Sequence, residues 1–219
     1  MLFRSTASGD RRVADNRDYD YAETSRALRQ EFSTIVEWIP PGSRGLDLGC
    51  GDGTLLELLV QKKNARAEGI ELTASGQAAS QAKGLAVRQG RIDEELPWSD
   101  NAFDVAICNV TLQMVMYPER LIREMARVAP CQIISFPNFA NIKNRLELLI
   151  LGRMPRSMLF GHTWWNTGHI HQLSLKDFID ILPNLGLGVR RRTYFGRIPM
   201  KWVAPNLLAT LGLFELARR

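Results

Sequence analysis

Short apolar runs alternate with amphipathic stretches through the first two thirds of the chain. Residues 26–38 repeat apolar positions at helical spacing, and Pro40-Pro41-Gly42 ends that pattern. Five strand-like runs and three further helical stretches follow in alternation. The strands are predicted at 44–49, 67–71, 85–88, 104–109 and 131–136, and the helices at 55–63, 77–83 and 118–128. This order predicts βαβ units and a doubly wound, mostly parallel α/β sheet.

The C-terminal third does not continue this alternation of strands and helices. Residues 137–172 carry Pro, Asn, Trp and His and are predicted to form an insertion over the sheet. Ser174 and Asp177 resemble a capping box, which predicts a helix to about residue 185 that Gly186 ends. Two alternating runs, 189–195 and 207–216, predict an antiparallel terminal strand pair, which brings the sheet to seven strands. We therefore expect a mobile arm at 1–25 and one domain over 26–219.

Composition narrows the class of protein. The chain has 219 residues, of which 45% are apolar and 23% charged, as in ordinary soluble proteins. Cys50, Cys108 and Cys131 are widely spaced and form no CxxC pair, which argues against a disulfide scaffold and a zinc site. The N-terminus has no signal-peptide pattern, and the most apolar run, 146–151, is too short to span a bilayer. We expect a cytoplasmic protein without a metal and without a membrane partner.

The positive charge is concentrated at one end. Residues 131–219 hold 12 basic and 4 acidic side chains, whereas the net charge of the whole chain is +5. Such asymmetry can mark a nucleic-acid surface. The basic residues are scattered except for Arg190-Arg191-Arg192, and an exposed edge strand produces such a run. The edge strand is the better interpretation, so we expect no nucleic-acid partner.

The segment that carries chemistry is LDLGCGDG, residues 46–53. A strand that runs into three alternate glycines and then a helix lets a ligand approach the backbone closely. Asp47 can bind a ligand ammonium or fix the loop amides, and Glu71, at the end of the second strand, can accept hydrogen bonds from both hydroxyls of a ribose. NAD and S-adenosylmethionine share that ribose contact. The GxGxG spacing, in place of GxGxxG, together with Asp47 favours S-adenosylmethionine.

Two further clusters are candidates outside this loop. His162, His169 and His171 lie near Trp164 and Trp165 and suggest either a metal or acid–base pair or, more simply, structural histidines. The amphipathic run 143–151, with the two tryptophans, predicts either a partner surface or a helix packed on its own sheet. Cys50 has no adjacent base and is interpreted as a small packing residue.

These motifs together resemble a known family. LDLGCGDG, Glu71 and the run LPWSDNAFD (96–104) resemble class I, Rossmann-like methyltransferases. From about residue 30 onward, WIPPGSRGLDLGCGDGTLLELL, TLQMVMYPERLIREMARV, SFPNFANIKNRLELLILGRMP and HTWWNTGHIHQLSLKDF are similar to the MetW family of methionine-biosynthesis proteins.

The resemblance implies a cofactor, a partner and a set of site residues. It implies S-adenosylmethionine or S-adenosylhomocysteine as ligand and support of homoserine O-acyltransferase as role; a small-molecule methyltransferase is the alternative. No catalytic residue or methyl acceptor follows from it, and a homodimer is possible. After the fourth strand the chain has Asn109-Val110-Thr111-Leu112 in place of (D/N)PP(Y/F), which argues against base methylation. The expected cofactor-binding residues are Asp47, Gly49, Cys50, Gly51, Gly53, Glu71, Leu72, Asp93 and Asn109.

Overall fold

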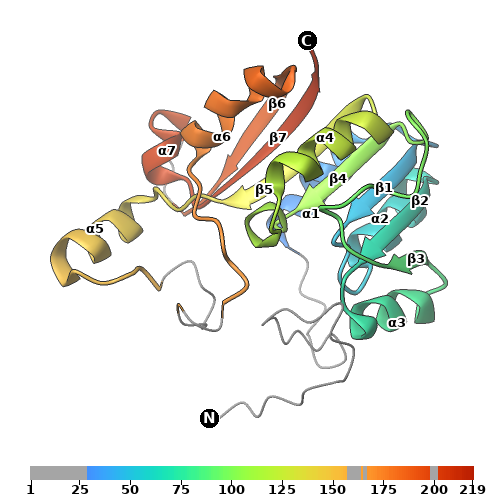
Figure 1. Cartoon of the computed structure of the whole chain (residues 1–219), viewed down its shortest axis with the longest axis horizontal. Coiled ribbons are helices and arrows are strands. Elements are labelled where there is room, and N and C mark those ends of the chain that lie inside the picture. Colours follow the sequence, from blue (N-terminus) through green and yellow to red (C-terminus); the bar gives the residue numbers. More distant parts are fainter. Residues whose placement is uncertain (1–28, 157–163, 165–166, 198–201) are drawn as a thin grey trace.

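A computed structural model describes residues 29–156, 164, 167–197 and 202–219, so the predicted arm at 1–25 lies outside the described residues. The described part is built on a seven-stranded sheet in the order β3-β2-β1-β4-β5-β7-β6 (Figure 1). The strands are β1 (Arg44–Leu48), β2 (Arg66–Glu71), β3 (Ala86–Gln89), β4 (Val105–Asn109), β5 (Cys131–Pro137), β6 (Leu187–Phe195) and β7 (Leu211–Arg218).

Strand directions follow the predicted pattern. The first five strands pair in parallel, and β7 inserts antiparallel between β5 and β6. Strand order reverses at β1, since β2 lies on one side of it and β4 on the other. Ligands of doubly wound sheets bind at such a reversal, outside the carboxyl ends of the strands.

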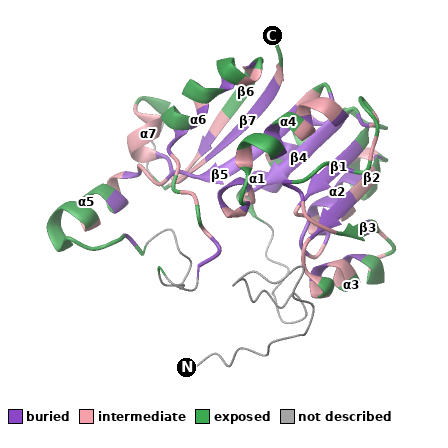
Figure 2. Cartoon of the chain, viewed as in Figure 1, coloured by how far each residue is buried: buried purple, intermediate pink, exposed green. Residues whose placement is uncertain are grey.

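Helices cover both faces of the sheet. They are α1 (Gln30–Trp38), α2 (Thr54–Lys63), α3 (Ala74–Ala82), η1 (Leu112–Met114), α4 (Pro118–Val128), α5 (Ile142–Leu151), α6 (Leu175–Ile181), η2 (Leu182–Leu185) and α7 (Pro205–Leu208). Successive strand residues point to opposite faces. Accordingly, Val105 and Ile107 pack with α1 and α2, whereas Ala106 and Cys108 pack with α4 and α6. Figure 2 shows the resulting buried centre, in which β1, β4 and β5 are almost entirely covered.

Local sequence signals explain where most helices begin and end. Pro118 stands at the first position of α4, where its missing N–H costs nothing. The Ser174–Asp177 capping box is present, with both reciprocal hydrogen bonds formed. The helix that it begins ends at Ile181 and continues as the 3₁₀ turn η2, because Pro183 has no N–H for an α-helical bond. Gly186 then closes the turn with a φ of 69°, as predicted.

One boundary of the terminal strand pair was predicted wrongly. The residues before Leu211 do not belong to β7, because Pro205–Leu208 form the short helix α7. The Leu208 N–H donates to the Ala204 carbonyl at 2.9 Å, which is a helical bond. Pro205, at the first position of α7, was the local signal for a helix there.

The arginine run lies on the edge strand β6, in agreement with the edge-strand interpretation. Arg191 and Arg190 both form ion pairs with Glu215 of β7, whose side chain is only 3% exposed. Nε of Arg191 donates to a Glu215 carboxylate oxygen at 2.7 Å, and its guanidinium lies 5.0 Å from the Trp38 ring centre. Two of the three arginines thus neutralise a buried carboxylate. Among the helices that the structure describes, none has the length and hydropathy needed to cross a bilayer.

Candidate cofactor site

The glycine loop follows β1 directly and leads into α2. Gly49, Gly51 and Gly53 have φ angles of 80°, 59° and 74°, in the left-handed region that side chains with a Cβ disfavour. A Cβ at Gly49 would also lie 2.7 Å from Cγ2 of Thr111. The alternate glycines therefore allow both the backbone path and its close approach to the segment after β4.

Four N–H groups of the loop, those of residues 49, 50, 51 and 53, donate to other groups of the protein. The N–H groups of Gly49 and Cys50 donate to the Ile70 carbonyl at 2.8 and 3.2 Å, and the Gly53 N–H donates to the Cys50 carbonyl. The Gly51 N–H donates to Oε2 of Glu71 at 2.9 Å. The loop is thus tied to the carboxyl end of β2, and its glycines serve close approach rather than anion binding.

Glu71 is 5% exposed and organises this edge of the sheet. Besides the Gly51 amide on Oε2, its Oε1 accepts hydrogen bonds from the Thr73 N–H and hydroxyl, both at 2.9 Å. A carboxylate has about four acceptor positions. Three of these acceptor positions are occupied, so the Glu71 carboxylate can accept a hydrogen bond from one ribose hydroxyl. To bind a second ribose hydroxyl, it would have to give up its hydrogen bond from the Thr73 hydroxyl.

An open cleft lies over the ends of β1, β2 and β4. Its empty volume is about 560 Å³, a figure that includes space open to solvent. Four of the predicted site residues line it: Gly49, Glu71, Leu72 and Asp93. The remaining lining residues are Thr73, Gly90, Arg91, Ile92, Thr111, Met114 and Val115.

Asp93 fixes the wall of the cleft. Its side chain is 3% exposed, and Oδ2 accepts hydrogen bonds from the N–H groups of Met116 and Tyr117 and from the Arg91 guanidinium. Burial opposes ionisation, but these hydrogen bonds outweigh it and hold the pKa of Asp93 below its usual value. Asp93 therefore joins the segment after β3 to the segment after η1; its contact with a cofactor stays a prediction.

Asp47 lies beneath the loop on β1 and is 2% exposed. Its Oδ1 atom is buried and has no hydrogen-bond partner among the described residues. Burial, with the nearby charge of Glu71, raises the pKa of Asp47 to about 7, although Arg29 opposes the shift. The sequence suggested that Asp47 either binds a ligand ammonium or fixes the loop amides. The loop amides are instead bound by the Ile70 carbonyl and the Glu71 carboxylate. A buried carboxylate oxygen without a donor is an open position for a cationic group.

Cys50, Gly51 and Gly53 do not line the cleft. The Cys50 thiol packs with Leu56 and Val87. Burial is the main reason that the pKa of this thiol lies far above its usual value, and the charges of Asp47 and Glu71 add to the effect. The thiol therefore stays protonated, in agreement with a packing role. A Cβ at Gly53 would lie 2.7 Å from the Ser80 hydroxyl, so this glycine allows α3 to approach the loop.

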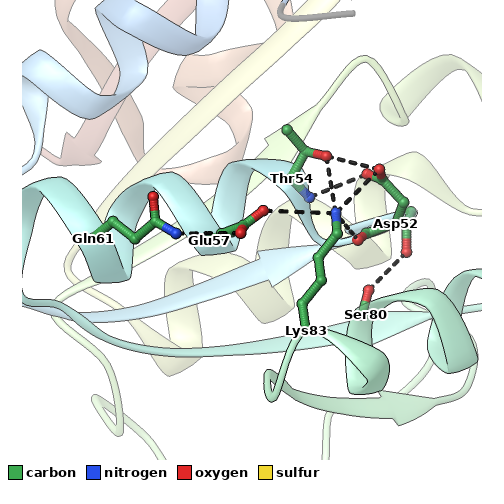
Figure 3. A network of polar contacts seen from close by, with 7 residues as sticks. Asp52, Thr54, Glu57, Gln61, Ser80 and Lys83 are labelled. Atoms are coloured by element: carbon green, nitrogen blue, oxygen red, sulfur yellow. Dashed lines mark hydrogen bonds and ion pairs between the residues drawn. The ribbon is translucent and has the colours of Figure 1, made fainter. Parts of the chain in front are cut away.

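Lys83 is a residue of this site that sequence reasoning missed. Its Nζ donates to the Asp52 carbonyl at 2.7 Å and to Oδ2 of Asp52 and Oγ1 of Thr54, both at 3.2 Å (Figure 3). The Ser80 hydroxyl donates to the Gly51 carbonyl at 3.1 Å. Burial raises the pKa of Asp52, yet the bonds from Thr54 and Lys83 outweigh it and lower the pKa overall. Two side chains from α3 and its C-cap thus hold the carbonyl side of the loop.

Asn109 stands at the end of β4, away from the cleft lining. Its amide donates to the buried carboxylate of Glu31 on α1 at 3.3 Å, and its Oδ1 accepts from the Ser135 hydroxyl at 2.5 Å. The next residue, Val110, has a φ of 53°, which is strained for a β-branched side chain. Asn109 therefore ties α1 to the ends of β4 and β5, and its contact with a cofactor stays a prediction.

The predicted histidine cluster lies partly outside the described residues, which exclude His162 and Trp165. His169 and His171 line a small second pocket beside Gln113, near the ends of β4 and β5. Oε1 of Gln113 and Nε2 of His171 are buried there without a hydrogen-bond partner in the described residues. Within those residues, no group of three or more His, Cys, Asp or Glu side chains is placed to hold a metal ion.

The arrangement fits an adenosine-bearing cation. Glu71 keeps an acceptor position on the cleft, Asp47 offers a buried carboxylate oxygen without a donor, and the glycine at position 49 leaves the cleft wall open. A cofactor with ribose hydroxyls and an ammonium or sulfonium group would satisfy both carboxylates. A ligand with phosphate groups near the loop would instead meet the carboxylates of Asp47 and Glu71, and four of the loop N–H groups already donate within the protein.

The comparison with known sequences gives a family. The model of the family described as "Methionine biosynthesis protein MetW" matches residues 29–216. The bifunctional methionine biosynthesis protein MetXA/MetW of Rhodopirellula baltica is 31% identical over 194 residues, which cover 84% of this chain. The chain spans about a third of that relative, since the match covers 31% of its length.

Solved structures agree on the fold. Magnesium protoporphyrin IX methyltransferase of Synechocystis, with bound S-adenosylhomocysteine, has a TM-score of 0.64 and 20% identity and covers 87% of this chain and 83% of its own. An S-adenosylmethionine-dependent methyltransferase of Mesorhizobium loti has a TM-score of 0.64 at 19% identity and covers 86% of this chain and 97% of its own. With a class I methyltransferase fold and a family model matched over most of its length, this chain belongs to the MetW family of methionine biosynthesis proteins.

Proposed function

We propose that the protein binds S-adenosylmethionine or S-adenosylhomocysteine in the cleft over β1 and β2 and supports homoserine O-acyltransferase in methionine biosynthesis. The observation that carries the ligand is the buried Oδ1 of Asp47, which has no hydrogen-bond partner among the described residues. Asp47 does not itself line the cleft, but it lies close enough to the cleft-lining Glu71 for the charge of Glu71 to raise its pKa. The positive ammonium or sulfonium group of the ligand would pair with the Asp47 carboxylate, and a ribose hydroxyl would donate to the free acceptor position of Glu71. When bound, S-adenosylmethionine supplies an electrophilic methyl group.

The support role rests on family membership and on the bifunctional relative. A protein that carries MetXA and MetW in one chain keeps its two parts at high effective concentration, which is useful where they act together. The methionine-biosynthesis family and the retained cofactor geometry together favour a protein that assists an acyltransferase and responds to a methionine derivative.

A small-molecule methyltransferase is the second candidate, and the second pocket favours it. Oε1 of Gln113, a residue of η1, and Nε2 of His171 have no hydrogen-bond partner in the part of the chain that the structure describes. The same turn η1 contributes Met114 to the cofactor cleft. A methyl acceptor placed there would lie near the carboxyl ends of β4 and β5, where acceptors of this fold are expected. Transfer of labelled methyl from S-adenosylmethionine to a metabolite would favour this candidate over the support role.

The ligand is tested by thermal unfolding with S-adenosylhomocysteine and a matched pair of glycine variants. Gly49→Arg fills the cleft, whereas Gly42→Arg replaces a glycine of similar φ, 76°, with nothing within 4 Å of its Cβ. At one hundred times the dissociation constant, a ligand adds about 2.7 kcal/mol, which raises the Tm of a domain this size by roughly 5–10 °C. We expect this shift in the wild type and in Gly42→Arg and none in Gly49→Arg.

The same experiment can contradict the proposal. No shift in the wild type at millimolar S-adenosylmethionine and S-adenosylhomocysteine would mean that the cleft does not hold these ligands. An equal shift in the Gly49→Arg variant would place the ligand elsewhere on the protein.

A further inference from the structure

Helix α5 reverses the usual arrangement of a surface helix. Six of its ten residues are aliphatic, yet the one residue of the helix that is buried is Asn144. Leu149 is 80% exposed and Ile150 71% exposed. The other strongly exposed apolar side chains of α5 are Leu146, Leu148 and Leu151. A helix that is apolar on most sides is normally covered by other protein or by lipid.

The helix projects from the body of the molecule and is not packed on the sheet. Figure 1 shows α5 extending away from the carboxyl end of β5, and Figure 2 shows its outer turns exposed. Of the two interpretations of residues 143–151, packing on the sheet is therefore wrong for the described structure. Met154, Trp164 and Ile170 are further exposed apolar side chains in the segment that follows α5.

The base of α5 is held firmly by three buried asparagines. Asn138 and Asn141 both donate to the Ala209 carbonyl, at 2.9 and 3.0 Å, and Asn138 donates also to the Asn206 carbonyl at 3.0 Å. Asn144 donates to the Phe139 carbonyl at 2.9 Å. The helix is thus fixed to the segment before β7 at one end and presents apolar side chains at the other, which suits a preformed docking element.

We propose that α5 is the surface through which this protein binds homoserine O-acyltransferase, with its exposed Leu and Ile side chains inserted into an apolar groove of the enzyme. The inference rests on the proposed support role. The choice of partner rests on the bifunctional relative, in which MetXA and MetW are joined in one chain and are therefore held at high effective concentration to each other.

The basic side chains around α5 indicate which charges should border the groove of the partner enzyme. Lys143, Arg145, Arg153 and Arg156 surround the apolar residues, whereas Glu147 is the one acidic residue of residues 140–156 and pairs with Arg153 at 3.7 Å. The groove on the enzyme should therefore be bordered by carboxylates, as charge complementarity between partners requires.

Binding of the two purified proteins tests the surface. The probe is the homoserine O-acyltransferase of the same organism, immobilised for biolayer interferometry. The test variant carries Leu149→Gln and Ile150→Gln, which keep side-chain length and helix propensity but remove the apolar contact. The control is Val60→Gln, because Val60 is also an exposed apolar helix residue, 41% exposed, but lies on α2.

We expect the wild type and Val60→Gln to bind equally and the α5 variant to bind at least about thirtyfold more weakly, as the loss of hot-spot residues predicts. The α5 variant should keep the wild-type Tm and its shift with S-adenosylhomocysteine, which shows that it is folded. Wild-type affinity in the α5 variant would overturn the docking surface and leave the support role standing.

Failure of the wild type to bind the enzyme would overturn both this inference and the support role. Two further outcomes would name another occupant of α5. A wild-type dimer that becomes a monomer in the α5 variant, measured by light scattering, would assign the helix to a second copy of this chain. Binding of the wild type but not of the α5 variant to phosphatidylglycerol vesicles would assign it to a lipid surface.

Discussion

Asp47 is the residue at which burial and charge conflict most strongly. It stands between the buried Leu46 and Leu48 of β1, its Oδ1 has no donor in the described structure, and its pKa is raised to about 7. The folded protein thus binds a proton on Asp47 between about pH 4 and pH 7 that the unfolded chain releases. Burial of an unpaired carboxylate is costly, and under the proposed function a cationic ligand would offset that cost.

The pH dependence of stability and ligand affinity tests this view of Asp47. Because the folded-state pKa is the higher one, the Asp47 contribution to the free energy of unfolding falls as pH rises from about 4 to 7. Asp47→Asn should remove that loss, so its Tm should exceed the wild-type Tm more at pH 8 than at pH 5.

Ligand affinity should change in the opposite direction. An ammonium or sulfonium group binds the ionised carboxylate, so wild-type affinity for S-adenosylmethionine should rise by roughly 25-fold from pH 5.5 to 7.5. Calorimetric titration of Asp47→Asn should show weaker binding without this rise. Parallel pH profiles of the two proteins, in both Tm and affinity, would contradict a raised pKa at Asp47.

The loop and α3 form one unit at the scale of secondary-structure elements. Lys83 reaches Asp52 and Thr54 from the C-terminal end of α3, and its side chain is 11% exposed. Without Lys83 the Asp52 carbonyl would lose its donor. The loop is therefore shaped before a ligand arrives, by contacts from residues about thirty positions further along the chain.

Replacement of Lys83 measures what this contact contributes. Lys83→Met should lower the free energy of unfolding by about 1–3 kcal/mol, because the partly buried Asp52 carbonyl loses its donor and the Asp52 carboxylate keeps only the donors of Thr54. Affinity for S-adenosylhomocysteine should fall beyond the loss of stability, and Lys83→Arg should restore part of it. Lys62→Met, an exposed lysine on α2, is the matched control. Equal affinity in Lys83→Met and Lys62→Met would mean that Lys83 does not position the loop.

The order of the elements was predictable, but their long-range contacts were not. Periodicity predicted the five parallel strands and the α4 boundaries, because burial on both sheet faces gives each strand a short apolar run. It failed at α7, where the apolar residues 207–209 also suit a strand. The hydrogen bonds of Glu71 to Gly51 and of Lys83 to Asp52 join residues 20 and 31 apart, and no local pattern encodes them.

The candidate site was predictable to a similar degree. The glycine spacing and the acid after β2 led to Gly49, Glu71 and Leu72, all of which line the cleft. Asn109 was expected at the cofactor, but its partners come from α1 and β5, and only the assembled sheet brings those together. The exposed face of α5 was not decidable from its sequence, since LELLIL is equally compatible with a buried helix.

At the scale of the whole molecule, the cofactor cleft and the docking element share one edge of the sheet. The cleft lies over the ends of β1, β2 and β4, and α5 begins shortly after the end of β5. Between them lies η1, where the Gln113 carbonyl accepts the N–H groups of Ile170 and His171. Hydrogen bonds therefore join η1, which contributes to the cleft, to residues 170 and 171 of the segment that follows α5.

The most direct test of the support role is the initial rate of homoserine O-acyltransferase as this protein is titrated into the assay with S-adenosylmethionine present. We expect the rate to change with increasing wild-type protein until it reaches a plateau. The Leu149→Gln, Ile150→Gln variant should need a much higher concentration for the same change, and the effect of Gly49→Arg should not depend on S-adenosylmethionine. A rate that stays constant up to saturating wild-type protein, with and without S-adenosylmethionine, would contradict the support role.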